Sequence, residues 1–137
     1  MAAAKATLTK IRKANVTSVL RQRGEEIVVR LRALISNADC SDFFKVTGHP
    51  SWSSLTFSDC DSASMWEIKT LWMQEMLARG ILTLGTHNLC FAHETGHVER
   101  LIGAYTEVLP ILRDAIREKS VARRLRCEPL KPLFKVR

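Results

Sequence analysis

The chain has 137 residues, 46% of them hydrophobic and 26% charged, and its formal net charge is +7. This length suits one domain with an ordinary hydrophobic core, and no apolar run approaches the ~20 residues that a membrane-spanning helix needs. We therefore expect a single domain over residues 1–137, with a leading helical region (1–36), an α+β core (43–128) and an extended tail (129–137).

The cysteines and the N-terminus bear on the cellular compartment. The cysteines lie 20 to 37 residues apart without a CxxC pair, which favours reduced thiols over a disulfide framework: Cys40, Cys60, Cys90 and Cys127. The stretch MAAAKATLTK contains no apolar segment of the kind that a secretory signal needs. We therefore expect a cytoplasmic protein.

Basic residues are concentrated at the two ends of the chain. Residues 1–35 and 117–137 each hold eight Lys or Arg against two acids, whereas the middle holds five against ten. A basic surface is typical of nucleic-acid binding, but no aromatic residue is interleaved with the terminal Lys and Arg as a stacking platform would need. The favoured interpretation is that these are solvated helix faces and an interface with acidic protein, and nucleic acid is the weaker alternative.

The first 36 residues predict helices. Residues 2–14 are good helix formers, and Asn15 offers an interruption and a side-chain cap for a second helix. Hydrophobic residues then recur at helical spacing from Val16 to Ile35, which indicates a long amphipathic helix with one buried face. Gly24 lies on that face, where a missing side chain lets another backbone come close.

The middle of the chain predicts two short strands and a helix. Residues 43–58 combine a turn at Gly48 and Pro50 with alternating apolar and polar residues, the pattern of half-buried strands. The next helix begins with Ser64 and Glu67 in capping-box spacing and stops at a glycine, Gly80.

The remainder predicts more strand and a last long helix. ILTLGTH and NLCFAH are two short strand-like runs, and a helix of about five turns starts at Val98, with Thr95 as its cap and a kink at Pro110. The simplest packing of these elements is a two-layer α+β domain, in which the helices cover one face of a small antiparallel or mixed sheet.

The stretch GTHNLCFAHETGH has the spacing of a possible metal or catalytic site. On a strand over residues 87–93, His87 and His93 would share one face while Cys90 would point away from both, into the core. His93 and His97 would straddle the junction between strand and helix, so the ligands of a zinc site would not converge. A Cys–His nucleophile lacks an orienting group, and no GxSxG, Walker or GxGxxG motif occurs. We expect neither a metal site nor a catalytic residue here.

Six segments taken in order resemble a known enzyme family: AKATLTKI, RGEEIVVRLRALI, VTGHPSWSSLTFSD, LWMQEMLARGILTLGTHNLCFAH, VERLIGAYTEVLPILRDAI and LKPLFKVR. Together they resemble the C-terminal small domain of class III pyridoxal-phosphate-dependent aminotransferases, nearest to members like glutamate-1-semialdehyde aminomutase. The most specific segment is the helix that runs into RGILTLGTHNLCFAH. The resemblance covers nearly the whole chain.

The resemblance implies the small domain of a fold-type I enzyme that closes over an active site held elsewhere. It places the Schiff-base lysine, the aspartate that pairs with the pyridine nitrogen and the phosphate-binding residues upstream of Met1. It therefore implies no cofactor-binding or catalytic residue in this chain, which should be inactive alone, and a missing large domain or a second subunit of a homodimer as partner. The full-length family uses pyridoxal phosphate and amino-acid-type substrates.

Two departures from the family pattern bear on function, the first at the start of the last helix and the second at the expected substrate side. The family commonly has a threonine and acidic residues after the final AH, whereas this chain has Glu94 followed by Thr95, Gly96 and His97. It also commonly places an arginine near this strand pair to bind a substrate carboxylate, and GTHNLCFAH contains none. The polar residues expected to face a substrate are His87, Asn88 and His93. The competing hypothesis is a standalone protein-binding or nucleic-acid-binding module with basic termini.

Overall fold

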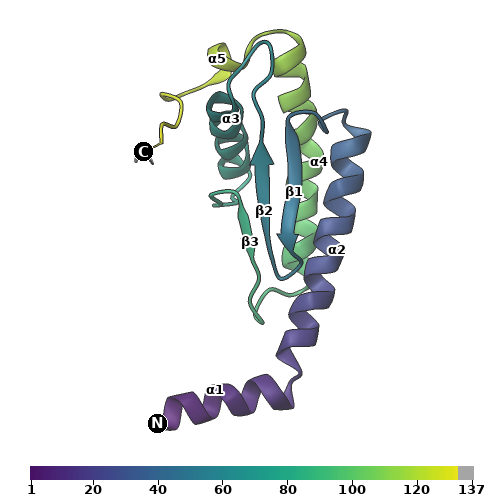
Figure 1. Ribbon diagram of the computed structural model, residues 1–137, viewed down its shortest axis with the longest axis vertical. Coiled ribbons are helices and arrows are strands. Elements are labelled where there is room, and N and C mark those ends of the chain that lie inside the picture. Colours follow the sequence, from purple (N-terminus) through teal and green to yellow (C-terminus); the bar gives the residue numbers. More distant parts are fainter. Residues whose placement is uncertain (133–137) are drawn as a thin grey trace.

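A computed structural model describes residues 1–132 of the chain (Figure 1). Five helices and three strands follow one another in this order: α1 (Ala2–Lys13), α2 (Val16–Asn37), β1 (Phe44–His49), β2 (Trp52–Phe57), α3 (Met65–Ala78), β3 (Thr86–Asn88), α4 (Thr95–Arg117) and α5 (Val121–Arg124). The expected tail over 129–137 is described only to residue 132, and its last five residues lie outside the described part. Among the described residues, no helix combines the length and the apolarity that a membrane crossing requires.

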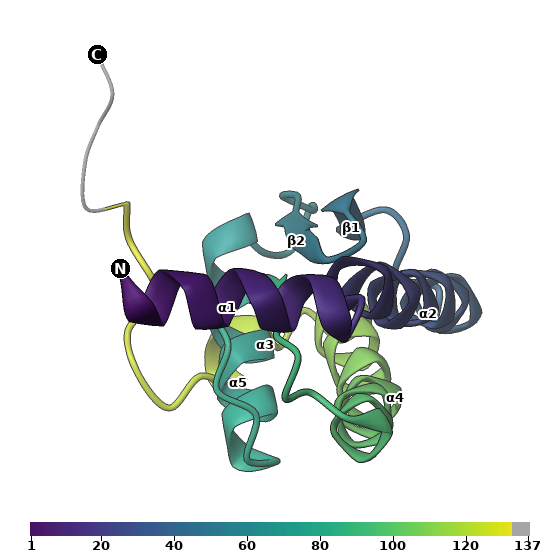
Figure 2. The ribbon, with the colours of Figure 1, turned by 90° about the horizontal axis from the view of Figure 1, so that it is seen from below.

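The three strands form one antiparallel sheet in the order β1-β2-β3, which confirms the α+β class. Alternate residues face the helices and are buried, among them Phe44, Val46 and Phe57. The other face carries exposed polar residues such as Lys45 and Thr56. Figure 2 shows β1 and β2 on one side of the molecule, with α3 and α4 on the other. The sheet therefore has one covered face and one open face, as a two-layer arrangement requires.

Aromatic side chains dominate the core between the sheet and the helices. Trp72 of α3 and Tyr105 of α4 are both 0% exposed, and their rings stack with centroids 6.4 Å apart. Phe44 and Phe57 meet edge to face across β1 and β2 at 4.9 Å. Pairs of this kind contribute about 0.5–1.5 kcal/mol each beyond their buried area. The core thus joins the sheet to the helices that carry the candidate site.

Gly24 shows why α2 needs a residue without a side chain at this point. A Cβ atom placed on Gly24 would lie 2.1 Å from the carbonyl oxygen of Pro50, in the turn between β1 and β2. No real carbon atom tolerates that distance, so the turn can lie against α2 only where a glycine stands. The prediction of a close backbone approach at Gly24 is confirmed.

Two predicted helix caps differ from the structure, and one is confirmed. Asn15 does separate α1 from α2, but it does so through a left-handed backbone (φ 46°) and its side chain caps nothing. Thr95 is the first residue of α4 rather than its cap, which is Glu94, so the helix begins three residues before Val98. The capping box of Ser64 and Glu67 forms as predicted at the start of α3.

The second pair of strand-like runs was predicted wrongly, because only residues 86–88 become a strand. β3 pairs with the first three residues of β2 and runs out of partners where β2 begins, at Trp52. Beyond Asn88 the chain therefore turns instead of extending, and the turn is closed by a hydrogen bond from the His93 amide to the Cys90 carbonyl (3.0 Å). Cys90 is exposed in this turn, which corrects its expected place in the core.

The helix α1 differs from all other helices of the fold in having no buried residue. It projects from the lower end of α2 in Figure 1 and carries exposed apolar side chains, including Leu8 at 67%. Its basic residues Lys5, Lys10, Arg12 and Lys13 have no acidic counterpart on the helix. The helix thus presents an amphipathic surface to its surroundings.

Candidate functional site

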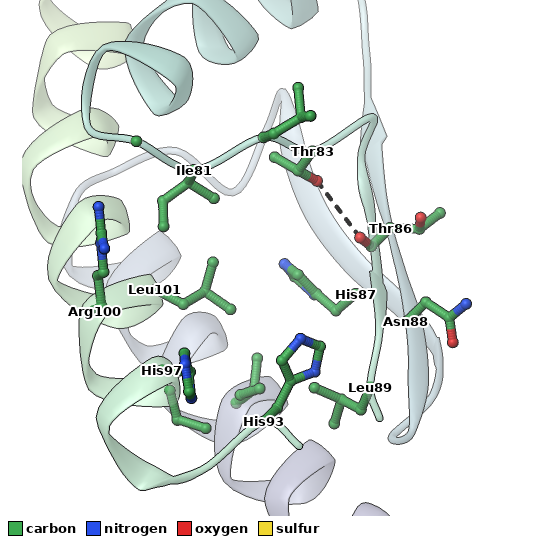
Figure 3. A pocket seen from close by; sticks show the side chains of 14 residues that line it. Ile81, Thr83, Thr86, His87, Asn88, Leu89, His93, His97, Arg100 and Leu101 are labelled. Carbon is green, nitrogen blue, oxygen red and sulfur yellow. Dashed lines mark hydrogen bonds between the residues drawn. The ribbon is translucent and has the colours of Figure 1, made fainter. Parts of the chain in front are cut away.

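A cavity of about 410 Å³ lies where β3, the segment after α3 and the start of α4 come together (Figure 3). Its volume falls in the range of small-molecule sites, roughly 300–1,000 Å³. Residues from four parts of the chain line it, so the cavity exists only in the folded domain. The three residues expected to face a substrate, His87, Asn88 and His93, all contribute to its wall or rim.

His87 is the innermost of these residues. It is 6% exposed, and its Nδ1 lies 2.9 Å from the Ser53 hydroxyl of β2 while its Nε2 lies 2.8 Å from the Tyr105 hydroxyl of α4. We call these three residues the buried network. Burial lowers the pKa of His87 to about 4, and it also raises the pKa of Tyr105. The imidazole is therefore neutral near pH 7.

The buried network occupies both nitrogen atoms of His87. A neutral imidazole carries one ring proton, so His87 donates to one of the two hydroxyls and accepts from the other. Its ring edge lines the cavity, but neither nitrogen is free to contact a ligand. The role of His87 in the site is therefore structural: it connects β3 to both β2 and α4.

Asn88 and His87 face opposite sides of β3, because successive strand residues alternate. Figure 3 shows the Asn88 side chain on the far side of the strand from His87. Asn88 pairs with Trp52 across the sheet and is exposed at the rim. Of the three residues predicted from the sequence, the structure brings His87 and His93 to the same cavity and turns the amide of Asn88 away from it.

His93 and His97 enter the cavity with their tautomers set by the backbone. The Cys90 amide donates to Nδ1 of His93 (3.1 Å), and the Glu94 amide donates to Nδ1 of His97 (3.1 Å). A nitrogen that accepts a hydrogen bond from an amide carries no proton of its own, so both neutral rings hold their proton on Nε2. Each ring therefore offers one N–H donor at its outer end.

This tautomer also argues against a metal site. A histidine that binds a metal through Nε2 normally donates its other ring N–H to an acceptor. Here Nδ1 of both rings faces an amide donor instead. If Nε2 bound a metal, Nδ1 would carry the ring proton, and this N–H would face the N–H of the amide. Among residues 1–132, no three His, Cys, Asp or Glu side chains converge as a metal ion would require. The contact from Cys90 to His93 is made by its amide and not by its thiol.

Arg100 is a residue of this cavity that no sequence motif indicated. It lies one helical turn beyond His97 on α4, and its guanidinium covers Gly80: a Cβ on Gly80 would lie 2.6 Å from Nη2. Within residues 1–132 the guanidinium has no hydrogen bond and no ion pair. The spacing of three residues between His97 and Arg100 on a helix was a signal that could have found this pair.

The acidic residue beside Arg100 is directed elsewhere. Glu99 makes a bidentate ion pair with Arg30 of α2, in which Nη2 lies 2.8 Å from Oε2. Hydrogen bonding to Arg30 lowers the pKa of Glu99. This pair holds the start of α4 against α2, and it leaves the cavity without an acidic side chain in its wall.

The cavity does not fit pyridoxal phosphate by itself. That cofactor needs a lysine for its imine and an acidic partner for its pyridine nitrogen. The lining residues include neither a lysine nor a carboxylate. Lys45 lies on the open face of the sheet, and the α1 lysines lie on the projecting helix. The lining of this cavity therefore offers no group for the imine of the cofactor and none for its pyridine nitrogen.

The chain was compared with family models, with characterised proteins and with solved structures. No protein-family model, no characterised protein and no solved structure matches the chain.

Proposed function

We propose that this chain is the C-terminal small domain of a pyridoxal-phosphate-dependent class III aminotransferase, or of an enzyme like glutamate-1-semialdehyde aminomutase. In the complete enzyme it would cover an active site whose cofactor is bound by a large domain. It would exclude water and position the substrate, but it would be inactive alone. This role agrees with the resemblance of the six sequence segments and with the two-layer α+β architecture.

The observation that carries this proposal is the incompleteness of the cavity. It has the volume of a small-molecule site and several hydrogen-bond donors, yet its wall contains no nucleophilic lysine and no carboxylate. A site of this composition needs a second surface to perform amino-group chemistry. On the small-domain side we propose that His93 faces the substrate, while His87 holds β3 in place behind it and Asn88 lies at the rim.

The unburied helix α1 supplies a second argument for a large partner. Leu8 and Ile11 are 67% and 38% exposed, and α1 buries none of its residues against the domain. An isolated 12-residue helix is marginal in water, and most helices are stabilised by packing of an apolar face. We propose that this face of α1 packs on the large domain.

Complementation tests the proposal. The probe is a glutamate-1-semialdehyde aminomutase from which the segment resembling this chain has been removed, loaded with pyridoxal phosphate. We expect the 137-residue chain to co-purify with it and to restore turnover. The chain alone with the cofactor should show no imine absorbance and no transamination; turnover by the chain alone, or failure to associate, would contradict the proposal.

A matched pair of variants makes this experiment specific. Leu8→Glu changes the apolar face of α1, and Val29→Glu changes an exposed apolar residue of α2 that is 65% exposed. Both sites are on the surface, so both variants should fold. We expect Leu8→Glu to abolish complementation and Val29→Glu to leave it intact; equal effects of the two would contradict docking through α1.

The alternative function is a standalone binding module, and the composition of α1 favours it specifically. Four basic side chains and no acidic one lie on a helix that buries nothing. If α1 binds nucleic acid, affinity for a mixed-sequence duplex should fall steeply with salt, with a log–log slope of about −0.9 per phosphate contacted. Binding that does not change with salt would exclude this version.

A further inference from the structure

The open face of the sheet carries one row of three planar side chains. Trp52 at the start of β2 lies directly opposite His49 of β1 and, on its other side, opposite Asn88 of β3. Side chains directly opposite each other in an antiparallel sheet share one face, with their Cβ atoms about 4.5–5.5 Å apart. All three residues are exposed, Trp52 at 64%. We call them the Trp52 row.

Small polar side chains surround the exposed indole. The neighbouring row of the same face consists of hydroxyl residues, Thr47, Ser54 and Thr86. On this face the three strands carry no acidic and no aliphatic side chain, so the apolar centre of a typical protein interface is missing. A lone tryptophan ring between polar side chains suits a flat aromatic ligand with a polar edge. A nucleobase has this form.

The two neighbours of the indole can bond to the edge of a base. Nδ1 of His49 accepts a hydrogen bond from the Ser51 amide (3.3 Å), so the neutral ring holds its proton on Nε2 and presents a donor. The Asn88 amide has no hydrogen bond among residues 1–132, and it presents both a donor and an acceptor. Unpaired bases are recognised in this way, by stacking on an aromatic ring and by hydrogen bonds to their edges.

A cavity of about 410 Å³ beside the Trp52 row offers a place for a phosphate. It lies between the start of α2 and the turn from β1 to β2, and its lining includes His49, Ser51 and Arg21. His49 thus belongs to both the row and the cavity. Arg21 has no ion pair within residues 1–132, and no acidic residue lines the cavity. A guanidinium binds phosphate oxygens through charge-assisted hydrogen bonds.

The end of the molecule that carries the row is basic. β1 ends and β2 begins at the lower end of the sheet in Figure 1, towards the part of α2 from which α1 projects. Residues 1–24 hold six Lys or Arg and no acidic residue. Folding also places the Phe91 ring centroid 5.6 Å from Nζ of Lys10. Aromatic side chains absent from the basic segment itself are therefore supplied by the sheet and by the turn after β3, and the surface complements a polyanion.

We propose that the open face of the sheet binds single-stranded nucleic acid. One base stacks on Trp52, its edge contacts His49 and Asn88, and a neighbouring phosphate lies on Arg21. This function goes beyond the aminotransferase proposal and does not rest on it. It also differs from duplex binding through α1, because an unpaired base is required.

Fluorescence anisotropy tests the proposal on the full chain. The probe is a fluorescein-labelled DNA strand of about eight nucleotides and mixed sequence, within the usual site sizes of single-strand binding folds. We expect a dissociation constant on the order of 0.1 mM near physiological salt. The same sequence as a duplex should bind at least about fivefold more weakly, because its bases are stacked on each other and cannot reach Trp52. Equal affinities for strand and duplex, or no saturable binding of the strand, would overturn the proposal.

Substitutions of Trp52 test the stacked base. Trp52→Leu should weaken binding of the single strand about tenfold, whereas Trp52→Phe retains an aromatic face and should lose about threefold at most. An unlabelled strand should quench the tryptophan fluorescence of the wild-type chain. This quenching should disappear in Trp52→Phe, because Trp72 is buried. Wild-type affinity in Trp52→Leu, or unchanged quenching in Trp52→Phe, would remove Trp52 from the site.

Arg21 and Arg32 form a matched pair for the phosphate. Both are exposed on α2, and Arg32 lies about three helical turns further along, outside the cavity. Arg21→Gln should weaken binding several-fold and reduce the slope of log affinity against log salt by about 0.7, the value for one phosphate of a single strand. Arg32→Gln should change neither quantity. Equal effects of the two variants would show that only the general positive charge attracts the strand.

The binding and complementation experiments fail independently. The strand is tested on the chain alone, so a failure of complementation leaves the result on the open face unchanged. Complementation by a chain that does not bind the strand would support the proposed function and overturn this inference.

Discussion

Two groups of polar residues lie a few residues apart in the chain and have opposite characters. The buried network, Ser53, His87 and Tyr105, is closed on itself and excluded from water. The second group, which we call the donor cluster, is formed by His93, His97 and Arg100, two of which are exposed, and points its donors outward. The same residue type, histidine, is thus a structural connector in one place and keeps an unoccupied donor in the other, depending on whether both ring nitrogens already have protein partners.

The largest effect should come from removing the connector. His87→Ala leaves two buried hydroxyls without a partner and opens a cavity, so the free energy of unfolding should fall by about 3 kcal/mol. Urea unfolding measures this loss. His49→Ala, at an exposed position of β1, is the control and should change stability by less than about 0.5 kcal/mol. Equal losses in both variants would show that His87 has no special structural role.

Acidification should weaken the fold through the same histidine. Its pKa is lowered from 6.5 to about 4 in the folded state, so between these values the unfolded chain binds a proton that the folded chain does not. Stability is therefore complete above pH 6.5 and is lost as pH falls toward 4, by up to about 3 kcal/mol.

The control for this pH dependence is His87→Gln, which does not titrate. Carboxylates whose pKa values are lowered by hydrogen bonds, such as Glu67 and Glu99, affect both proteins alike. The variant should therefore show a much flatter stability profile between pH 6.5 and 4 in urea unfolding. Parallel profiles would assign the acid sensitivity to other groups.

Tyr105→Phe should have a smaller effect, because it removes only one hydroxyl from the buried network. His87 loses one of its two partners, and we expect a cost of about 1–2 kcal/mol. In a His87→Ala background the same change should cost almost nothing, since the partner is already gone. Additive losses in the double variant would mean that Tyr105 and His87 do not depend on each other.

The smallest effect on stability should come from the donor cluster. His97→Asn retains an acceptor for the Glu94 amide and lies on the surface, so stability should change by less than about 0.5 kcal/mol. The same urea unfolding curve measures it. A loss above about 1 kcal/mol would make His97 a structural residue and remove the distinction between the two groups.

Local chemistry made several parts of the fold predictable. The capping box needs only Ser64 and Glu67 at the correct spacing, and the close approach at Gly24 is expected of a glycine on the apolar face of a helix. The two strands over 43–58 alternate clearly enough to be recognised from their own residues. In each case the residues that give the signal are neighbours in the chain, although the backbone that approaches Gly24 is that of Pro50.

The segment after α3 was predicted less well for the opposite reason. Residues 81–93 contain two runs of strand-forming side chains, but a strand also needs a partner, and β2 offers one only as far as Trp52. Whether Cys90 is buried depended on that partner rather than on its own sequence context. The candidate residues His87, Asn88 and His93 were named because they are polar residues of the segment that the family resemblance placed beside a substrate. Arg100 was missed because it comes after that segment, on a helix that looked like an ordinary amphipathic one.

The amino-acid sequence alone determined the four longer helices, the first hairpin, the α+β class and the concentration of histidines before α4, but not the short helix α5. Only the tertiary structure decided that His87 is enclosed while His93 and His97 keep an outward donor. It also decided that Arg100 lines the same cavity without an ion-pair partner among residues 1–132. The physical reason is that helix and hairpin preferences arise from residues a few positions apart. Burial, tautomer and the balance of charge around a cavity arise from residues that approach one another only after the sheet and α4 have packed together.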